Sequence, residues 1–233
     1  MHMKYVKAAF LLAGVAALGS TAVYAQVGAA VEGISRTDVA VSLYGAFSGT
    51  TNGNGTTQSP ANAAGGLIEV RHIVNPIIGY EGTYSFNRAN QTYSALIDCP
   101  GVGCPLTETE AVSANAHEIS GDWVASLKVA NIRPFALAGV GVLFNVPSGQ
   151  PKLSYTSTGG GLPTFPPGSL TNNSTKPAFV YGAGVDWGLV PHLGLRLQYR
   201  GNLYKAPDLT TIFTSTGAFT HTAEPMIGVY FRL

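Results

Sequence analysis

The charged residues of this 233-residue sequence recur at alternate positions within apolar segments, which places them on one face of extended strands. In the segment Leu193–Tyr204, leucine and tyrosine alternate with Gly194, Arg196, Gln198 and Arg200. Buried charges of mixed sign are tolerated when they are paired and hydrogen-bonded. The spacing therefore predicts an internal charge network, whose expected members are Glu69, Arg71, Glu81, Glu118, Asp122, Asp186, Arg196, Arg200, Glu224 and Arg232.

Such a network could act in two ways. It could fill and specify the interior of the fold, or it could form a gate whose ion pairs exchange partners to admit small solutes. We expect the filling role, and the mixture of signs indicates no ion selectivity.

The sequence gives little indication of enzymatic, metal-binding or cofactor-binding chemistry. The histidines after the N-terminal region, which are His72, His117, His192 and His221, have no serine partner at a motif-like spacing, so we expect no enzymatic activity. Alternation puts His117 on the opposite face from Glu118 and Asp122, which argues against a metal site. The glycine pairs Gly139/Gly141 and Gly182/Gly184 do not fit the phosphate-loop patterns, and no cofactor is expected.

Two cysteines stand close together as Cys99 and Cys104. Pro100 and Gly101 between them favour a tight turn that could bring the sulfurs together. We predict a local disulfide in a loop, because the chain is expected to be exported to an oxidising compartment. A metal or redox role is the weaker interpretation.

Export is indicated by the N-terminus. Lys4 and Lys7 precede an apolar stretch of small residues, and Val23-Tyr24-Ala25 matches a signal-peptidase site. We therefore expect residues 1–25 to be a signal peptide, residues 26–35 a short periplasmic segment, and residues 36–233 the folded domain. A retained membrane anchor is the alternative.

Composition narrows the fold class. Charged residues make up 11% of the chain, against about 25% in a typical soluble domain. The net charge of +1 argues against a nucleic-acid partner. No stretch after residue 25 approaches the about 18–20 apolar residues of a membrane helix. Two fold classes remain compatible with this composition: a membrane β-barrel and an apolar soluble β-protein.

Alternating segments predict eight antiparallel strands in an up-and-down transmembrane β-barrel. Their connections alternate between long and short, as in outer-membrane barrels with short periplasmic turns, and the even count puts both ends in the periplasm. The long connections are Gly49–Ala64, Arg88–Ser113, Val146–Thr175 and Lys205–Gly217. The strands are expected at Arg36–Ser48, Gly65–Val74, Ile77–Asn87, Ala114–Val129, Arg133–Asn145, Lys176–Leu189, Leu193–Tyr204 and Ala218–Leu233.

The side-chain types indicate which face is inside. The segment Arg133–Asn145 is apolar on both faces and is left out of this comparison. In the other seven segments the apolar faces carry no charge and are too bulky for the interior of an eight-stranded barrel, which barely holds side chains. Tyrosine and tryptophan recur near strand ends, as interfacial girdles require. We therefore expect the apolar faces to meet lipid.

Three stretches resemble known sequences: Arg133–Gly141, Tyr181–Trp187 with Leu193–Arg200, and the C-terminal Met226–Leu233. The first two resemble the OmpA-like, opacity-type family of small outer-membrane barrels. In the last, Ile227, Val229, Phe231 and Leu233 alternate as in the signal read by the outer-membrane assembly machinery, although the usual final Phe is replaced by Leu. The resemblance implies a barrel domain in the Gram-negative outer membrane, with that machinery and membrane lipid as partners.

We expect a structural or surface-interaction protein of the bacterial outer membrane, whose long loops could bind an unknown surface ligand. The alternatives are a narrow, porin-like channel for small solutes, a lipid-modifying enzyme and a soluble periplasmic β-barrel.

Overall fold

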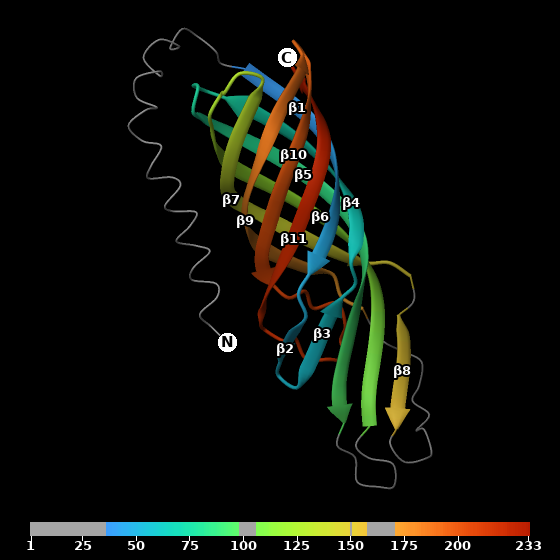
Figure 1. The fold of residues 1–233 in the computed structure, drawn as a ribbon. Coiled ribbons are helices and arrows are strands. Elements are labelled where there is room, and N and C mark those ends of the chain that lie inside the picture. Colours follow the sequence, from blue (N-terminus) through green and yellow to red (C-terminus); the bar gives the residue numbers. More distant parts are fainter. Residues whose placement is uncertain (1–35, 98–105, 150, 158–170) are drawn as a thin grey trace, which may run out of the picture.

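A computed structural model describes residues 36–97, 106–149, 151–157 and 171–233. Eight strands in this part of the chain form a closed antiparallel barrel, because β1 pairs with β11 and β5 pairs with β6 (Figure 1). The barrel strands are β1 (Arg36–Ser48), β4 (Ala63–Ile73), β5 (Ile78–Ile97), β6 (Leu106–Ser126), β7 (Ile132–Pro147), β9 (Ser174–Val190), β10 (Leu193–Lys205) and β11 (Phe219–Arg232). The predicted fold class is confirmed.

Tight turns lie at the end of the barrel where β1 begins and β11 ends (Figure 1). The Asn75 side chain accepts hydrogen bonds from the backbone N–H groups of Ile77 and Ile78, at 3.0 and 2.8 Å. A second turn places Ala130 at φ 52°, between the paired residues Val129 and Ile132. Short turns at the end that holds both termini of the barrel mark the periplasmic side.

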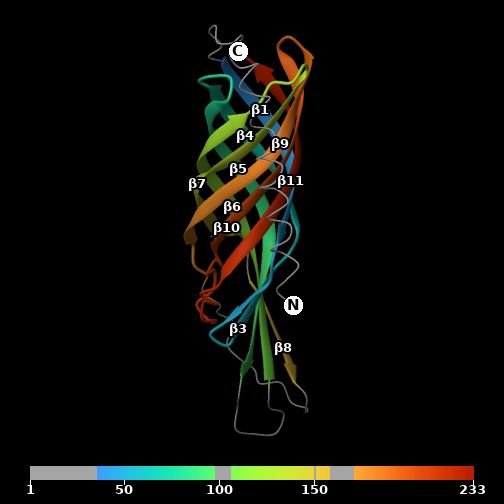
Figure 2. The same cartoon turned by 60° about the vertical axis from the view of Figure 1, so that its left-hand side comes forward.

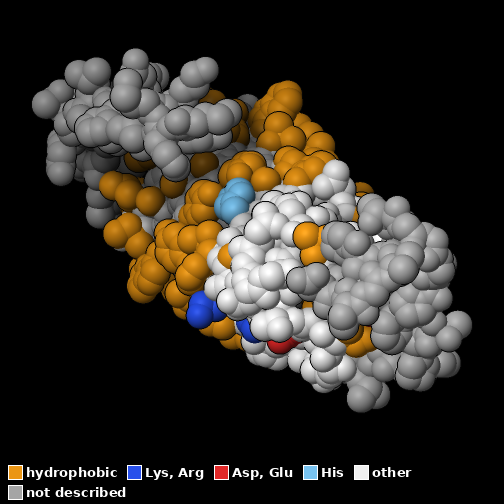
Figure 3. All heavy atoms as spheres, turned by 90° about the horizontal axis from the view of Figure 1, so that it is seen from below, with side chains coloured by type: hydrophobic (Ala, Val, Ile, Leu, Met, Phe, Trp, Pro, Cys, Tyr) orange, Lys and Arg blue, Asp and Glu red, His pale blue; other side chains and the backbone are white. Residues whose placement is uncertain are grey.

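The barrel is apolar outside and charged inside. Leu43 and Trp123 are each 70% exposed on the outer wall, whereas Arg196 and Arg200 in the lumen are 0% exposed. A soluble barrel would have the opposite arrangement, so that alternative is wrong. Seen from the outer end, hydrophobic side chains cover the barrel wall and give way to polar surface further out (Figure 3).

The strands β5 and β6 continue far beyond the barrel (Figure 2). They have 20 and 21 residues, about twice the 9–11 that a tilted strand needs to cross a membrane. Three short strands flank these extensions: β2 (Thr51–Gly53) pairs with β3 (Thr56–Pro60), β3 pairs with β5, and β8 (Lys152–Ser157) pairs with β6. We call the five-stranded extension, residues 51–60, 91–97, 106–112 and 152–157, the outer platform.

Three segments that were predicted to be loops contain strands instead. They are Gly49–Ala64, Arg88–Ser113 and Val146–Thr175. These segments are rich in Ser, Thr, Asn and Gly, which punctuate strands in many sequences. Outside the bilayer, however, a strand needs no apolar face toward lipid, and threonine and tyrosine favour extended structure. No helix among the described residues is long and apolar enough to span a membrane.

Candidate functional site

One layer of ion pairs crosses the lumen in the periplasmic half of the barrel. Arg196 from β10 binds Asp186 of β9 with two hydrogen bonds, of 2.6 and 2.9 Å, and also contacts Glu69 of β4. Arg71 donates to Glu81 at 2.7 Å and to Asp186 at 3.3 Å. The Arg71 guanidinium also lies 3.9 Å from the centre of the Phe135 ring. Five strands are thus tied together across the interior.

A second layer lies further out. Arg200 donates to Glu118 at 2.5 Å and to the Ser120 hydroxyl at 2.9 Å, and Asn202 donates to the other Glu118 oxygen at 2.9 Å. Ser120 donates in turn to Asp122 at 2.7 Å. Glu224 is buried directly opposite Arg200 in the pairing of β10 with β11. The carboxylates therefore surround one buried cation.

The two layers leave little open space in the lumen. Beyond the Arg200 layer, a cavity of about 30 Å³ is lined by residues that include Glu118, Asn202 and Glu224, which suffices for isolated water molecules. A larger cavity of about 310 Å³ opens at the periplasmic end, where Arg133 and Asp186 lie in its wall. The two linings share no residue, and the Arg71 and Arg196 ion pairs lie between them.

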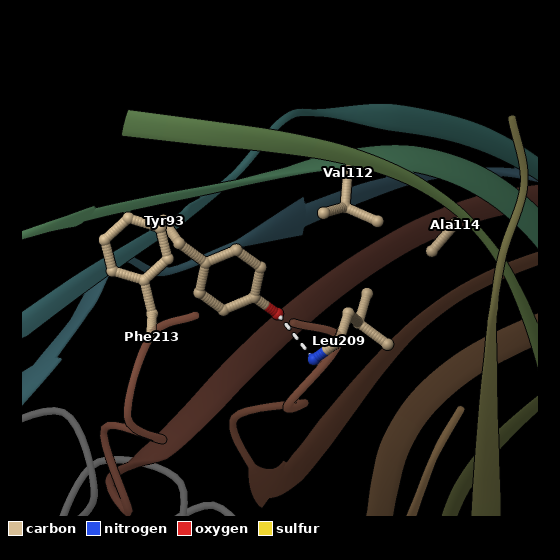
Figure 4. Close-up of a cluster of buried hydrophobic side chains, with 5 residues drawn as sticks. All are labelled: Tyr93, Val112, Ala114, Leu209 and Phe213. Carbon is tan, nitrogen blue, oxygen red and sulfur yellow. Dashed lines mark hydrogen bonds between the residues drawn. The ribbon is translucent and has the colours of Figure 1, made fainter. Parts of the chain in front are cut away.

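A cap formed by residues 206–218, between β10 and β11, covers the inner face of the outer platform. Leu209 and Phe213 of the cap are 0% and 6% exposed, and they pack against Tyr93, Val112 and Ala114 (Figure 4). The Tyr93 and Phe213 rings are stacked, with centroids 6.3 Å apart. This cluster holds the cap by apolar burial.

Hydrogen bonds fix the cap in place. The Tyr93 hydroxyl donates to the carbonyl of Pro207 at 2.9 Å. It also accepts from the Leu209 N–H at 3.2 Å, and the dashed line in Figure 4 marks this second hydrogen bond. Burial raises the pKa of this hydroxyl well above its ordinary value, an effect that nearby acidic groups reinforce and the Leu209 hydrogen bond partly opposes. Thr210 donates to the fully buried Glu110.

The sequence interpretation missed this assembly, because it treated Arg88–Ser113 and Lys205–Gly217 as loops. A signal was present: Gln91 and Tyr93 alternate with smaller residues, as do Glu108, Glu110 and Val112. These alternate residues are buried on one face of the platform.

The predicted site residues fall in several places. Ten were expected in one network, and nine of them are buried in the lumen, whereas Arg232 is half-buried near the periplasmic mouth, donating to the carbonyl of Pro191 at 3.3 Å. The buried nine are Glu69, Arg71, Glu81, Glu118, Asp122, Asp186, Arg196, Arg200 and Glu224. Cys99 and Cys104 lie outside the described residues.

The histidines take part in surface contacts. His117 and His221 each form a 2.8 Å hydrogen bond with a tyrosine, Tyr84 and Tyr181 respectively. No group of three or more metal-ligating side chains occurs in the part of the chain that the structure describes. The C-terminal residues Ile227, Val229, Phe231 and Leu233 all lie on the outer surface of the barrel.

Comparison with known proteins identifies the class. The family described as outer membrane protein beta-barrel domain matches residues 8–223, so the chain belongs to this family and is a protein of the bacterial outer membrane. No curated protein sequence is detectably similar to it.

Several solved structures match this chain at low sequence identity. Neisserial surface protein A (NspA) is 12% identical with a TM-score of 0.50, and the match covers 84% of this chain and 96% of NspA. OprG from Pseudomonas aeruginosa is 10% identical with a TM-score of 0.47, covering 87% and 99%. Ail of Yersinia pestis, solved in complex with the heparin analogue sucrose octasulfate, is 12% identical with a TM-score of 0.45, covering 85% and 99%. The match to NspA supports the fold alone.

Proposed function

We propose that this protein is a closed, non-enzymatic outer-membrane barrel that presents the outer platform to a ligand outside the cell. The observation that carries the proposal is the contrast between a lumen crossed by ion pairs, with Arg71, Arg196 and Arg200 fully buried, and a sheet that extends far past the bilayer. A side-chain-filled lumen offers no aqueous path, whereas an ordered extension offers a surface.

The chemistry of the platform indicates the kind of ligand. Among its described residues three are charged, and of these Glu108 and Glu110 are buried while Lys152 is exposed. Most of the other exposed side chains of the platform are Ser, Thr and Asn, and Leu96 is an exposed apolar exception. We infer that the ligand is recognised by hydrogen bonding rather than by charge, as a glycan or an uncharged polypeptide segment would be.

Delivery of the protein to the outer membrane requires a signal peptide and an assembly signal. We propose that residues 1–25 are removed on export, that residues 26–35 stay in the periplasm, and that residues 36–233 form the inserted domain. In this proposal the assembly machinery reads Ile227, Val229, Phe231 and Leu233, whose outward position on the last strand leaves them accessible before the barrel closes. Cys99 and Cys104 are proposed to pair.

A variant that lacks the β5 and β6 parts of the platform, with which β3 and β8 pair, tests the binding role. In the barrel, Asn87 of β5 pairs with Ala116 of β6. Replacing residues 88–115 with Asn-Gly should therefore join these two strands by a two-residue hairpin at the membrane surface. Cells displaying equal amounts of either protein would be tested for adherence to a panel of immobilised glycans and glycoproteins. We expect adherence to require the platform; equal adherence, with both barrels folded, would contradict the proposal.

A narrow channel is the second candidate, favoured by the cavities at both ends of the lumen. Conductance in planar bilayers separates the two. We expect no conductance steps from the wild type, with insertion into the bilayer confirmed separately by heat-dependent gel mobility of the reconstituted protein. Regular steps from the wild type would favour the channel.

A further inference from the structure

The periplasmic cavity of about 310 Å³ has a strongly cationic wall. Its lining contains four basic side chains and a single acidic one, Asp186. The remaining lining comes from the turns and from Tyr230. The basic residues are Arg36, Lys128, Arg133 and Arg232.

Arg133 is the residue that most needs an anionic partner. It is 8% exposed, and its Nε and Nη1 atoms donate to no acceptor among the described residues. A buried guanidinium without a partner is costly, because it has lost water without gaining a carboxylate or another acceptor. The backbone of β7 holds it there, since Arg133 pairs in register with Asp186 of β9.

The carboxylates near Arg133 are already engaged by other cations. Both oxygens of Asp186 accept hydrogen bonds from Arg196, and one of them also accepts from Arg71. Asp38, which is buried next to the cavity, forms a 2.7 Å ion pair with Arg36. Positive charge therefore exceeds negative charge around the cavity, and the excess is concentrated on Arg133, Lys128 and Arg232.

We propose that this cavity binds a phosphate group, with Arg133 as its principal ligand. Guanidinium groups present paired N–H donors that match phosphate oxygens, and the volume lies at the small end of the range of ligand pockets. The phosphate could be free in the periplasm or could belong to a lipid headgroup. The exposed side chains Ile132, Leu189 and Val190 line the same cavity and would lie beside the acyl chains of a bound lipid.

Two binding measurements distinguish free phosphate from the phosphate of a lipid headgroup. The first is calorimetric titration of the refolded mature protein, in uncharged detergent at low ionic strength, with inorganic phosphate. The second is native mass spectrometry after release from nanodiscs of phosphatidylglycerol or of phosphatidylcholine. The variants are Arg133→Gln, Lys128→Gln and, as a matched cation at the opposite end of the barrel, Lys205→Gln. Heat-dependent gel mobility confirms that each variant is folded.

We expect saturable binding of one phosphate group that Arg133→Gln weakens at least about tenfold, that Lys128→Gln weakens less, and that Lys205→Gln leaves unchanged. Titration with inorganic phosphate would identify a free-phosphate site, whereas retention of phosphatidylglycerol without phosphate binding would identify a lipid site. Absence of binding in both measurements, or binding that Arg133→Gln does not weaken, would overturn the proposal.

Discussion

The two halves of β5 face their surroundings in opposite ways. In the barrel, Tyr84 and Phe86 point outward and are 43% and 40% exposed, while the small polar residue Ser85 points into the lumen. In the outer platform, Tyr93 points inward and is 2% exposed, while Ser94 points outward. Because successive side chains of a strand alternate, the aromatic residues have changed from even, outward positions to an odd, inward position within one continuous strand, while Leu96 stays exposed.

The change of solvent accounts for this difference. Lipid favours apolar side chains on the outer wall and leaves the charges to pair in the lumen, whereas water outside favours polar side chains on the surface and apolar ones beneath a cover. The cap supplies that cover with Leu209 and Phe213. Paired charges therefore fill one half of the molecule, and apolar packing holds the other half.

The largest effect is expected from breaking the paired charges. Arg200→Ala would leave Glu118 buried without its cation, and removing one partner of a buried ion pair costs about 3–5 kcal/mol. Urea unfolding of the protein in lipid vesicles measures this loss. Arg200→Met combined with Glu118→Gln should recover part of it, since Glu118 then carries no charge, whereas Asp122 and Glu224 stay buried near the lost cation. If the double variant were as unstable as the single one, the pairing would not be the cause.

A slightly smaller effect is expected from the cap. Tyr93→Ala removes a buried ring and both hydrogen bonds to the cap, which should cost about 3 kcal/mol of local stability. Hydrogen exchange should show faster exchange in residues 206–218 and unchanged exchange in the barrel strands. Global loss of protection would show instead that the two halves unfold as one unit.

A matched pair of substitutions on β6 compares the outer surfaces of the two halves. Ile119 is 56% exposed on the barrel wall, and Ile119→Arg should cost about 2 kcal/mol because it places a cation in lipid. Thr109→Lys, on the platform part of the same strand, should change stability by less than about 0.5 kcal/mol. Urea unfolding measures both, and equal costs would contradict the proposed position of the membrane boundary.

The smallest effect is expected from alkaline pH. The pKa of Tyr93 is raised in the folded protein, so its contribution to cap stability is complete below the ordinary tyrosine pKa of about 10 and is lost as pH rises above that value. Hydrogen exchange in the cap should therefore accelerate above pH 10 beyond its intrinsic pH dependence. The additional acceleration should be absent in Tyr93→Phe.

The sequence predicts the barrel half well for a physical reason. A charge toward lipid is so unfavourable that alternation in segments such as Leu193–Tyr204 is nearly free of exceptions, and it identifies both the strand and its inner face. Alternation does not show which charges meet across the lumen. The contact of Arg200 with Glu118 depends on the relative stagger of distant strands, which is a property of the closed barrel.

The platform half is poorly predicted because its pattern is weaker. Tyr93 lies between Thr92 and Ser94, and Val112 lies between Ala111 and Ser113, so no long regular alternation marks them. Their partner Leu209 lies in a segment without regular structure that is distant in sequence. Arg133 was missed for a different reason. The segment Arg133–Asn145 is apolar on both faces, so alternation there did not identify an inner face.

Fluorescent labels along β6, which pairs with β5 along the whole length of β5, would test the central claim that the sheet passes from lipid into water. Single cysteines would be introduced at Thr107, Thr109, Ile119 and Trp123 in a Cys99→Ser/Cys104→Ser background, labelled, and exposed to brominated lipid or to aqueous iodide. We predict lipid quenching at Ile119 and Trp123, and iodide quenching at Thr107 and Thr109. Lipid quenching at all four positions would place the platform in the membrane and contradict this account.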